Sequence, residues 1–255
     1  MTINVRDYGA IGNGKAEDGA IQAAVNAASE GEIIFFPATS TNKYLIYKTI
    51  TVDKGLSFLA DHGVQIVNGA SANEVNAGVS GSAAFLCTPT SSESLFVFQG
   101  IEFVSGGMGI HISSSLAIHP LSRAEDCKFS SIASKSVFIQ APGGNFSIDR
   151  CLIAGLGGTT GVLFETNANF DLISVQNTII RNQVKEAVRV KKALMVAPGG
   201  SGSIYCHNLT LVSNAQGIIF DNATGSAVNI RYVLNTANVV MSGSGLLSTG
   251  SAFVS

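Results

Sequence analysis

Charged residues are scarce in this sequence. Lys, Arg, Asp and Glu make up 13% of its 255 residues, about half of the roughly 25% that is usual in soluble domains. The net charge is −2, and no run of basic residues is longer than Lys191-Lys192. Nucleic acid and anionic membranes bind to broad basic surfaces, so we expect neither as a partner. Because the mean hydropathy is +0.34, uncharged polar residues or association with another chain must keep the surface in solution.

Long apolar runs and closely spaced cysteines are also missing. No apolar stretch approaches the 18 or so residues of a membrane span, and the first residues, Met1–Asp7, lack the basic and apolar segments of a signal peptide. The four cysteines, Cys87, Cys127, Cys151 and Cys206, form no C-x-x-C pair. We therefore predict buried, reduced thiols, no metal site and no cofactor.

What the sequence does contain is a repeat. From about residue 95, a polar residue and a small or turn-forming residue introduce a short apolar strand six times over. The marker residues stand at positions 100, 127, 151, 177, 208 and 235, with a mean separation of 27 residues. A second apolar strand follows each marker after nine or ten residues, at Ile110–Ile112, Val137–Ile139, Val162–Phe164, Val188–Val190, Ile218–Phe220 and Leu246–Leu247.

A repeat of this length, with several short strands and no room for two helices, is typical of one coil of a β-solenoid. Each strand then pairs with its equivalent in the next coil, about 4.8 Å away. A β-propeller is the rival architecture, but its blades need about 40 to 50 residues. We predict an all-β chain, a right-handed parallel β-helix forming a single domain over residues 1–255, with regular coils over residues 95–255. Asn177, Asn208 and Asn235 should stack as a ladder.

The N-terminal part has a different pattern, typical of a helix over Ala20–Ala28. Asp18 is the predicted N-cap, Ile21 and Val25 lie on the apolar face, and Gly31 follows the end of the helix. An open end of a solenoid is an unpaired sheet edge over an exposed core. We therefore predict that this helix caps the first coil.

Four segments resemble the opening of the pectate-lyase-like superfamily: Asn4–Gly14, Glu17–Ala24, Ile34–Pro37 and Tyr44–Ile46. This superfamily includes polysaccharide lyases, glycoside hydrolases and bacteriophage tailspike proteins. The resemblance implies a β-helix whose residues 1–46 form the N-terminal cap helix and first coils, and it is not specific for one activity. Relatives usually have Asp where Asn13 stands and Thr where Gly19 stands.

The segment Gly9–Ala16 also fits the phosphate-binding pattern G-x-x-x-x-G-K. Ala16 stands where that pattern needs the hydroxyl of Ser or Thr, and no alternating βαβ pattern surrounds the segment. We therefore interpret it as part of the cap.

Cleavage of a polysaccharide requires paired carboxylates, or carboxylates that hold Ca²⁺ beside a base. Aligning the coils brings Asp126, Asp149, Arg150 and His207 together as the candidate acid–base group. The alternative is that Asp126 and Arg150 form a solvated pair between coils and that His207 is a surface residue. Register errors of one residue would move any of them to the opposite face.

A second acidic pair, Glu165 with Asp171, lies in or beside a turn. It lacks a basic partner in the aligned coils, so we interpret both residues as part of the turn.

The second strand of each coil places one residue on the outer face, between two core residues. These residues are His111, Phe138, Leu163, Arg189, Ile219 and Leu247. Four of the six are large and apolar, so we predict an exposed stripe and an oligomer interface formed by Phe138, Leu163, Ile219 and Leu247. The alternative is that a loop such as Ala70–Ser94 covers the stripe.

Phage tailspikes and related virion proteins of the superfamily resemble this arrangement and are parallel homotrimers. The resemblance implies a structural or adhesive protein of the virion surface, as a tail spike, fibre or capsid decoration, with other virion proteins or a surface glycan as partners. The end at Phe253–Ser255 lacks a second capping helix, so we expect another chain or domain to protect it. The alternative is a polysaccharide lyase or glycoside hydrolase that acts on an acidic polysaccharide in an extracellular or cell-surface location.

Overall fold

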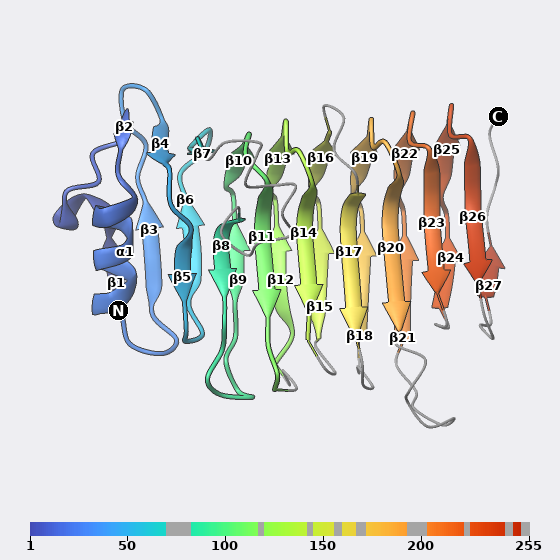
Figure 1. Ribbon diagram of the computed structural model, residues 1–255, viewed down its shortest axis with the longest axis horizontal. Helices are drawn as coiled ribbons and strands as arrows, with labels where there is room; N and C mark the ends of the chain where they lie inside the picture. The colour runs from blue at the N-terminus through green and yellow to red at the C-terminus, as the bar shows by residue number, and fades with distance from the viewer. Residues whose placement is uncertain are drawn as a thin grey trace.

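The protein is a stack of short strands that form three parallel sheets, with the first and last described strands at opposite ends (Figure 1). In this computed structural model the described residues are 1–69, 83–116, 120–141, 145–155, 160–166, 172–192, 203–221, 225–242 and 247–250. All strand pairs within these residues are parallel, and each strand pairs with the equivalent strands of neighbouring coils. The predicted parallel β-helix is confirmed.

The strands of the described residues fall into three sheets, each of which runs from the N-terminal to the C-terminal end of the stack. Sheet A contains β1 (Thr2–Asn4), β3 (Ile33–Phe36), β6 (Ser57–Ala60), β9 (Val97–Gln99), β12 (Ser122–Glu125), β15 (Phe146–Asp149), β18 (Leu172–Gln176), β21 (Ser203–His207), β24 (Gly225–Val228) and β27 (Leu247–Gly250). Sheet B contains β2 (Asn13–Ala16), β4 (Lys43–Ile46), β7 (Gln65–Asn68), β10 (Glu102–Val104), β13 (Lys128–Ser130), β16 (Leu152–Ala154), β19 (Ile179–Arg181), β22 (Thr210–Val212) and β25 (Arg231–Val233). Sheet C contains β5 (Ile50–Val52), β8 (Ala83–Cys87), β11 (Met108–Ser113), β14 (Lys135–Gln140), β17 (Thr160–Thr166), β20 (Glu186–Lys192), β23 (Gln216–Asp221) and β26 (Ala237–Ser242).

The length of a coil follows from the register of sheet B. Successive partners in that sheet are Phe103, Phe129, Ile153, Ile180, Leu211 and Tyr232, so one coil takes between 21 and 31 residues. Variation of this size is accommodated in the turns, because the strands themselves keep a fixed register.

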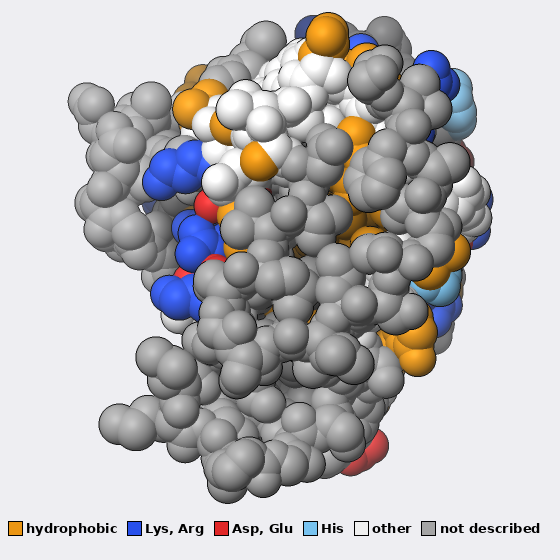
Figure 2. Space-filling view, turned by 90° about the vertical axis from the view of Figure 1, so that its right-hand side faces the viewer, with side chains coloured by type: hydrophobic (Ala, Val, Ile, Leu, Met, Phe, Trp, Pro, Cys, Tyr) orange, Lys and Arg blue, Asp and Glu red, His pale blue; other side chains and the backbone are white. Residues whose placement is uncertain are grey.

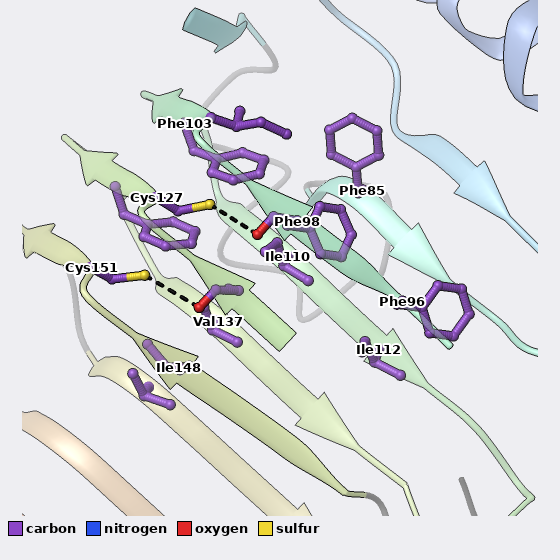
Figure 3. Close-up of a cluster of buried hydrophobic side chains, with 14 of the residues drawn as sticks. Phe85, Phe96, Phe98, Phe103, Ile110, Ile112, Cys127, Val137, Ile148 and Cys151 are labelled. Atoms are coloured by element: carbon purple, nitrogen blue, oxygen red, sulfur yellow. Dashed lines mark hydrogen bonds between the residues drawn. The ribbon is translucent and has the colours of Figure 1, made fainter. Parts of the chain in front are cut away.

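Inward-facing side chains of the three sheets form one continuous core (Figure 3). Equivalent rings of neighbouring coils stack face to face: the centroids of Phe103 and Phe129 are 4.9 Å apart, with 9° between the planes. This separation matches the strand spacing of about 4.8 Å, because each ring occupies the same position in its coil.

The cysteines belong to this core. All four are free and buried, as predicted. The thiol of Cys127 lies 3.4 Å from the carbonyl oxygen of Phe98, and that of Cys151 lies 3.5 Å from the carbonyl oxygen of Ala124 (Figure 3). Burial raises the pKa of Cys206 to about 12, so this thiol stays protonated at neutral pH.

A tight turn leads from sheet A to sheet B in each regular coil, and its residue has a positive φ. We call this turn the A–B corner; its residues are Gly100, Asp126, Arg150, Asn177, Asn208 and Asn229. The side-chain amide of Asn208 donates to Asn177 over 3.0 Å, and that of Asn229 donates to Asn208 over 2.5 Å. Asparagine tolerates this left-handed conformation better than most residues.

The predicted ladder is therefore right for Asn177 and Asn208 and wrong for Asn235. Asn235 lies in the next turn and accepts from the amide of Asn214 over 3.1 Å. The reason is that the last regular coil takes only 21 residues, so the marker of that coil is Asn229.

Because the last regular coil is short, the prediction that Leu247 lies in the second strand of its coil is also wrong. The sheet C strand of the last coil is β26, where Val240 pairs with Ile219. Leu247 lies in β27 of sheet A, where it pairs with Gly225 and where only its backbone is described.

Helix α1 (Asp18–Ala27) lies at the N-terminal end of the stack, after the short 3-10 helix η1 (Val5–Tyr8) (Figure 1). Ile21 and Val25 are fully buried and join the core cluster of the sheets. Among the described residues, no helix has the length and apolar character that a membrane span requires.

The N-cap of α1 is Glu17, so the prediction that Asp18 caps the helix is wrong. The helix begins at Asp18, whose carboxylate accepts from the backbone N–H of Tyr47 over 3.3 Å. The buried carboxylate of Glu17 instead accepts from the N–H groups of Ile11 and Gly12, over 2.8 and 2.7 Å. Burial raises the pKa of Glu17. These N–H groups belong to the G-x-x-x-x-G-K segment, so the chain's own carboxylate occupies the donors that such a loop offers to phosphate.

Candidate functional site

Three of the four predicted acid–base residues meet at the A–B corner. The guanidinium of Arg150 forms a two-point contact with the carboxylate of Asp126, with Nε–Oδ1 and Nη2–Oδ2 distances of 2.8 and 3.0 Å. The same guanidinium also donates to Asp149. Asp149 lies at the end of β15 and accepts from the amide of Asn177 over 2.8 Å. One arginine thus joins two carboxylates of adjacent coils, and the asparagine ladder continues from them.

The electrostatics of this corner favour permanently ionised groups. The hydrogen bonds from Arg150 hold the pKa of Asp126 below its usual range, and those with Asp126 raise the pKa of Arg150. A general acid needs a raised carboxyl pKa, so Asp126 has the wrong direction of shift for that role.

His207 is not part of this group. It occupies the same column of sheet A as Asp149, but Gln176 lies between them. Two strand spacings separate the backbones, roughly 10 Å. The imidazole of His207 instead lies 3.4 Å from the hydroxyl of Ser226. The alignment of the coils is wrong by one residue at this point. The markers at 127 and 151 follow the A–B corner, whereas those at 177 and 208 lie in it.

The predicted stripe lies on the outer face of sheet C. His111, Phe138, Leu163, Arg189 and Ile219 are successive partners in the register. The side chains are nevertheless buried within the single chain: Phe138 is 8% exposed, Leu163 7% and Ile219 5%. The expectation of an exposed stripe is therefore corrected. Residues 70–82 of the segment that we considered as a cover lie outside the described residues.

Stacking contributes to this burial. The rings of His111 and Phe138 are 4.6 Å apart and nearly parallel. Burial lowers the pKa of His111 to about 4, so this imidazole is neutral at physiological pH. The interface role of Phe138, Leu163, Ile219 and Leu247 stays a prediction.

Beside the stripe, strands β14, β17 and β20 form a hollow of about 200 Å³, which we call the sheet C hollow. It is lined by Lys135, Thr160, Leu163, Glu165, Lys185, Glu186, Arg189 and Lys191. Leu163 supplies an apolar surface, and charged side chains surround it. In the view from the C-terminal end, basic and acidic side chains alternate along one edge of the molecule (Figure 2).

The carboxylates of the hollow already have partners. Glu186 is buried; it accepts from Arg189 over 2.9 Å and from the hydroxyl of Thr160 over 2.7 Å. Glu165 lies 3.6 Å from the ammonium of Lys191. The interpretation of Glu165 as a turn residue without a basic partner is therefore wrong, since it lies in β17 and pairs with Lys191 of β20. Asp171 lies outside the described residues.

Basic side chains outnumber acidic ones in the hollow by four to two. Among the described residues, neither Lys135 nor Lys185 forms an ion pair. Lys135 is half-buried, and its ammonium lies 4.6 Å from the centroid of the Phe138 ring. Burial lowers the pKa of Lys135. An arrangement of this kind attracts an anion and offers it charge-assisted hydrogen bonds.

Sequence reasoning missed this hollow, although a signal was present. Its polar residues occupy the positions that flank the stripe in successive strands: Lys135, Thr160 and Glu186 on one side, and Glu165 and Lys191 on the other. The prediction considered only the central outward position of each sheet C strand. Comparing all three outward positions between successive coils would have revealed the hollow. Within the described residues, no three His, Cys, Asp or Glu side chains are arranged to hold a metal ion.

No family model matches the sequence, and no curated protein matches it. Among solved structures, the chain is similar to the ORF18 protein of Geobacillus virus E2, with 14% identity and a TM-score of 0.54 over 100% of this chain and 62% of that one. A surface adhesin of Streptococcus pneumoniae, PfbA, has 17% identity and a TM-score of 0.41 over 91% of this chain and 66% of that one.

The A-module of a mannuronan C-5 epimerase from Azotobacter vinelandii has 14% identity and a TM-score of 0.34, over 98% of this chain and 99% of that one. The chain thus spans less than two thirds of the length of the viral protein and of the adhesin. At 14% identity, the likeness to the viral protein is evidence about the fold alone. The fold of this chain is a parallel β-helix, the fold that it shares with the viral protein.

Proposed function

We propose that this chain is a structural and adhesive β-helix of a bacteriophage surface, in a tail spike, a fibre or a capsid decoration. In this proposal it is located on the virion, assembles as a homotrimer and contacts an acidic glycan without cleaving it. Other virion proteins hold the assembly in place. The solvent-facing polar residues and the rigid, repetitive core suit a protein whose task is to present a surface.

The observation that carries the adhesive role is the sheet C hollow. Four basic side chains surround the apolar Leu163, while Glu165 and Glu186 are engaged by Lys191 and Arg189. An acidic sugar offers a carboxylate to the basic groups and the C–H face of its ring to the leucine. A volume of about 200 Å³ is smaller than the roughly 300 to 1,000 Å³ of pockets that enclose drug-sized ligands, so the hollow suits one unit of a chain.

Two observations support a passive role over cleavage. Asp126 and Asp149 are both bound by Arg150, and the two carboxylates of the hollow, Glu165 and Glu186, are paired with Lys191 and Arg189. The virion location is supported by the likeness to a viral protein, which is a fold-level analogy.

In the same proposal the β-helix is right-handed, with coils of about 27 residues, and α1 closes its N-terminal end. The right-handed sense is the one that nearly all parallel strand crossovers adopt. The burial of Ile21 and Val25 against the core supports the capping role.

The test combines binding and cleavage on one sample. Oligosaccharides of uronic acids are titrated into the protein by calorimetry, and the same mixtures are then assayed for new reducing ends and unsaturated products. Binding without product supports the proposal. Absence of binding to acidic oligosaccharides, with a neutral oligosaccharide as control, contradicts the adhesive role of the hollow.

A polysaccharide lyase or hydrolase is the second candidate, and Lys135 is the observation that favours it. Burial lowers the pKa of this lysine, and it shares the hollow with Glu165. A lysine of lowered pKa is suited to remove a proton from a substrate. Under this alternative the location is extracellular or the cell surface. Product that disappears in Lys135→Ala and persists in Asp126→Asn would establish cleavage in the hollow.

A further inference from the structure

Two of the four cysteines occupy equivalent positions in neighbouring coils. Cys127 directly follows Asp126 of the A–B corner, and Cys151 follows the next corner residue in the same way. The backbone carbonyl of Cys127 accepts from the N–H of Leu152 over 3.0 Å, in the ladder that joins β13 to β16. The Cα atoms of the two cysteines are therefore one strand spacing apart, about 4.8 Å.

The two thiols point in the same direction, toward carbonyl oxygens of sheet A (Figure 3). Cys127 Sγ lies 3.4 Å from the carbonyl oxygen of Phe98, and Cys151 Sγ lies 3.5 Å from that of Ala124. Phe98 and Ala124 are themselves partners in the register of sheet A, so the two sulfur atoms have the same offset as the two coils. Burial raises the pKa of Cys127, and contact with the thiol of Cys151 raises it further. The two thiols thus lie against each other in the core.

This contact is specific to one pair. The register places Cys87 beside Val52 and Ile112. It places Cys206 beside Val175 and Ala227. The column that contains the pair consists, in chain order, of Ile101, Cys127, Cys151, Thr178, Leu209 and Ile230, all of them buried. Aliphatic residues fill three of these six positions, so packing alone does not require two thiols next to each other.

The geometry is compatible with a covalent bond between the two coils. A disulfide needs Cα atoms that are about 4.4 to 6.8 Å apart, and one strand spacing lies within this range. Because the sulfur atoms are already in contact, rotation about the Cα–Cβ bonds brings them to bonding distance. The ring that the bond closes contains one complete coil.

We infer that Cys127 and Cys151 form a disulfide that joins two neighbouring coils when the chain folds in an oxidising environment. The oxidant is a low-molecular-weight disulfide such as oxidised glutathione. The thiolate of one cysteine attacks the oxidant, forms a mixed disulfide and releases one glutathione thiol. The thiolate of the other cysteine then attacks the sulfur of the first and releases the second glutathione. Two electrons and both cysteine protons pass to the oxidant, which is reduced to two thiols.

This reaction precedes the packing of the two coils. Cys127 is 2% exposed and Cys151 4%, so a mixed disulfide with glutathione does not fit around them in the folded chain. Burial also keeps Cys127 protonated, whereas the attacking form is the thiolate. Once the coils close, the same burial protects the bond from external thiols. The oxidation state of the pair therefore depends on the conditions during folding.

The bond reinforces the A–B corner. Asp126 and Arg150 join the same two coils at the surface, through an ion pair of 2.8 Å, and the cysteines that follow them join the coils in the core. A disulfide restricts the unfolded chain over the coil that it closes and so stabilises the folded state. Such bonds persist outside the cell, and this inference requires neither the proposed glycan binding nor the proposed trimer.

The first test compares two folding environments. The full chain is produced by cell-free synthesis in an oxidising or a reducing glutathione buffer, denatured, labelled with N-ethylmaleimide and digested with trypsin. Cleavage after Lys128 and after Arg150 places the two cysteines on separate peptides. From the oxidising buffer we expect these two peptides as one cross-linked species, with Cys87 and Cys206 labelled. Four labelled thiols in both buffers, or a cross-link that involves Cys87 or Cys206, overturns the inference.

The second test uses two variants that carry the residue of an adjacent coil. Thr178 follows Cys151 in the column, and its hydroxyl donates to the carbonyl oxygen two residues earlier, as the Cys151 thiol does. Cys151→Thr therefore keeps that bond and loses the disulfide. The control Cys206→Val has the residue of its register partner Val175.

Oxidation during folding should raise the midpoint of thermal unfolding of the wild type by about 5 °C or more. Cys206→Val should keep this difference, and Cys151→Thr should lose it. No difference in the wild type, or an equal difference in Cys151→Thr, overturns the inference. If Cys151→Thr does not fold, the peptide map of the wild type still decides.

Discussion

The A–B corner and the sheet C hollow contain the same kinds of charged residue and use them differently. At the corner, Arg150 binds Asp126 and Asp149, and the network continues into Asn177. In the hollow, Glu165 and Glu186 are paired as well, but two further lysines, Lys135 and Lys185, have no ion-pair partner among the described residues.

The difference shows how a solenoid separates stability from binding. A turn that recurs at the same position in each coil lets polar groups bond to their equivalents above and below, so the corner becomes a closed network. An outer sheet face has no such constraint, and an excess of one charge can persist there because water and ligands reach it. Changes at the corner should therefore affect folding, and changes in the hollow should affect binding.

The largest effect is expected for the double substitution Lys185→Glu/Lys191→Glu. Both side chains line the hollow and are exposed. Each charge-assisted contact contributes roughly 1.5–3 kcal/mol, so the affinity for an acidic oligosaccharide should fall about 100-fold or more, with the free energy of unfolding nearly unchanged. Calorimetric titration measures the affinity.

The matched control for this pair is Lys15→Glu/Lys48→Glu, which changes the net charge equally at exposed positions far from the hollow. Its affinity should stay within about threefold of wild type, because distant exposed charges are screened. An equal loss in both double variants would mean that overall charge, and not the hollow, attracts the ligand.

The next effect is on stability, at the corner. Asp149 is 9% exposed and accepts hydrogen bonds from Arg150 and Asn177. Asp149→Ala should lower the free energy of unfolding by about 2 kcal/mol, because it leaves the amide of Asn177 and part of the guanidinium without an acceptor. Urea unfolding measures the change. Asp7→Ala, at an exposed position, should stay within about 0.5 kcal/mol of wild type, and glycan binding should be unchanged in both.

The fold could be predicted from the sequence because the residues that stack between coils recur at a regular spacing. Marker residues such as Gly100, Asn177 and Asn208 need a left-handed turn, and an apolar strand follows each at a nearly constant distance. The error at Asn235 arose where a coil is shorter, since asparagine also occurs in the following turn at Asn214 and Asn235. Asparagine alone therefore does not identify which turn of the coil it occupies.

The site was harder to predict, for two physical reasons. Alternation along a strand fixes which side of the sheet a residue faces, and the predicted side was right for Phe138 and Leu163. Alternation does not tell whether another part of the chain covers that side, and both side chains are buried.

The markers used to align the coils also differ by one residue: Cys127 and Cys151 follow the A–B corner, whereas Asn177 and Asn208 lie in it. This difference misplaced His207 relative to Asp126 and Arg150. A pocket needs several columns to be known together, and their mutual position depends on turn geometry.

A smaller effect is expected for the ladder itself. Asn208 donates to Asn177 and accepts from Asn229, with a φ of 52°. Asn208→Ala should lower the free energy of unfolding by about 1 kcal/mol or more, from lost hydrogen bonds and from a conformation that alanine disfavours. Asn208→Gly removes the same bonds without the conformational cost in the left-handed region, so a smaller loss for glycine than for alanine would separate the two causes. Equal stability of Asn208→Ala and wild type would contradict the ladder's contribution.

The smallest effect is on the acid side of the pH profile, through Asp126. Hydrogen bonds from Arg150 lower the pKa of this carboxyl in the folded protein, so the unfolded chain binds the proton more tightly. The stabilisation is then fully present above the ordinary value of about 3.9 and is lost as the pH falls through the lowered folded pKa. Because the side chain is 44% exposed, the gain should be below about 1 kcal/mol. Urea unfolding at pH 7 and pH 3 should show a smaller acid-induced loss in Asp126→Asn than in wild type, and an identical loss in both would mean that the corner pair does not couple folding to protonation.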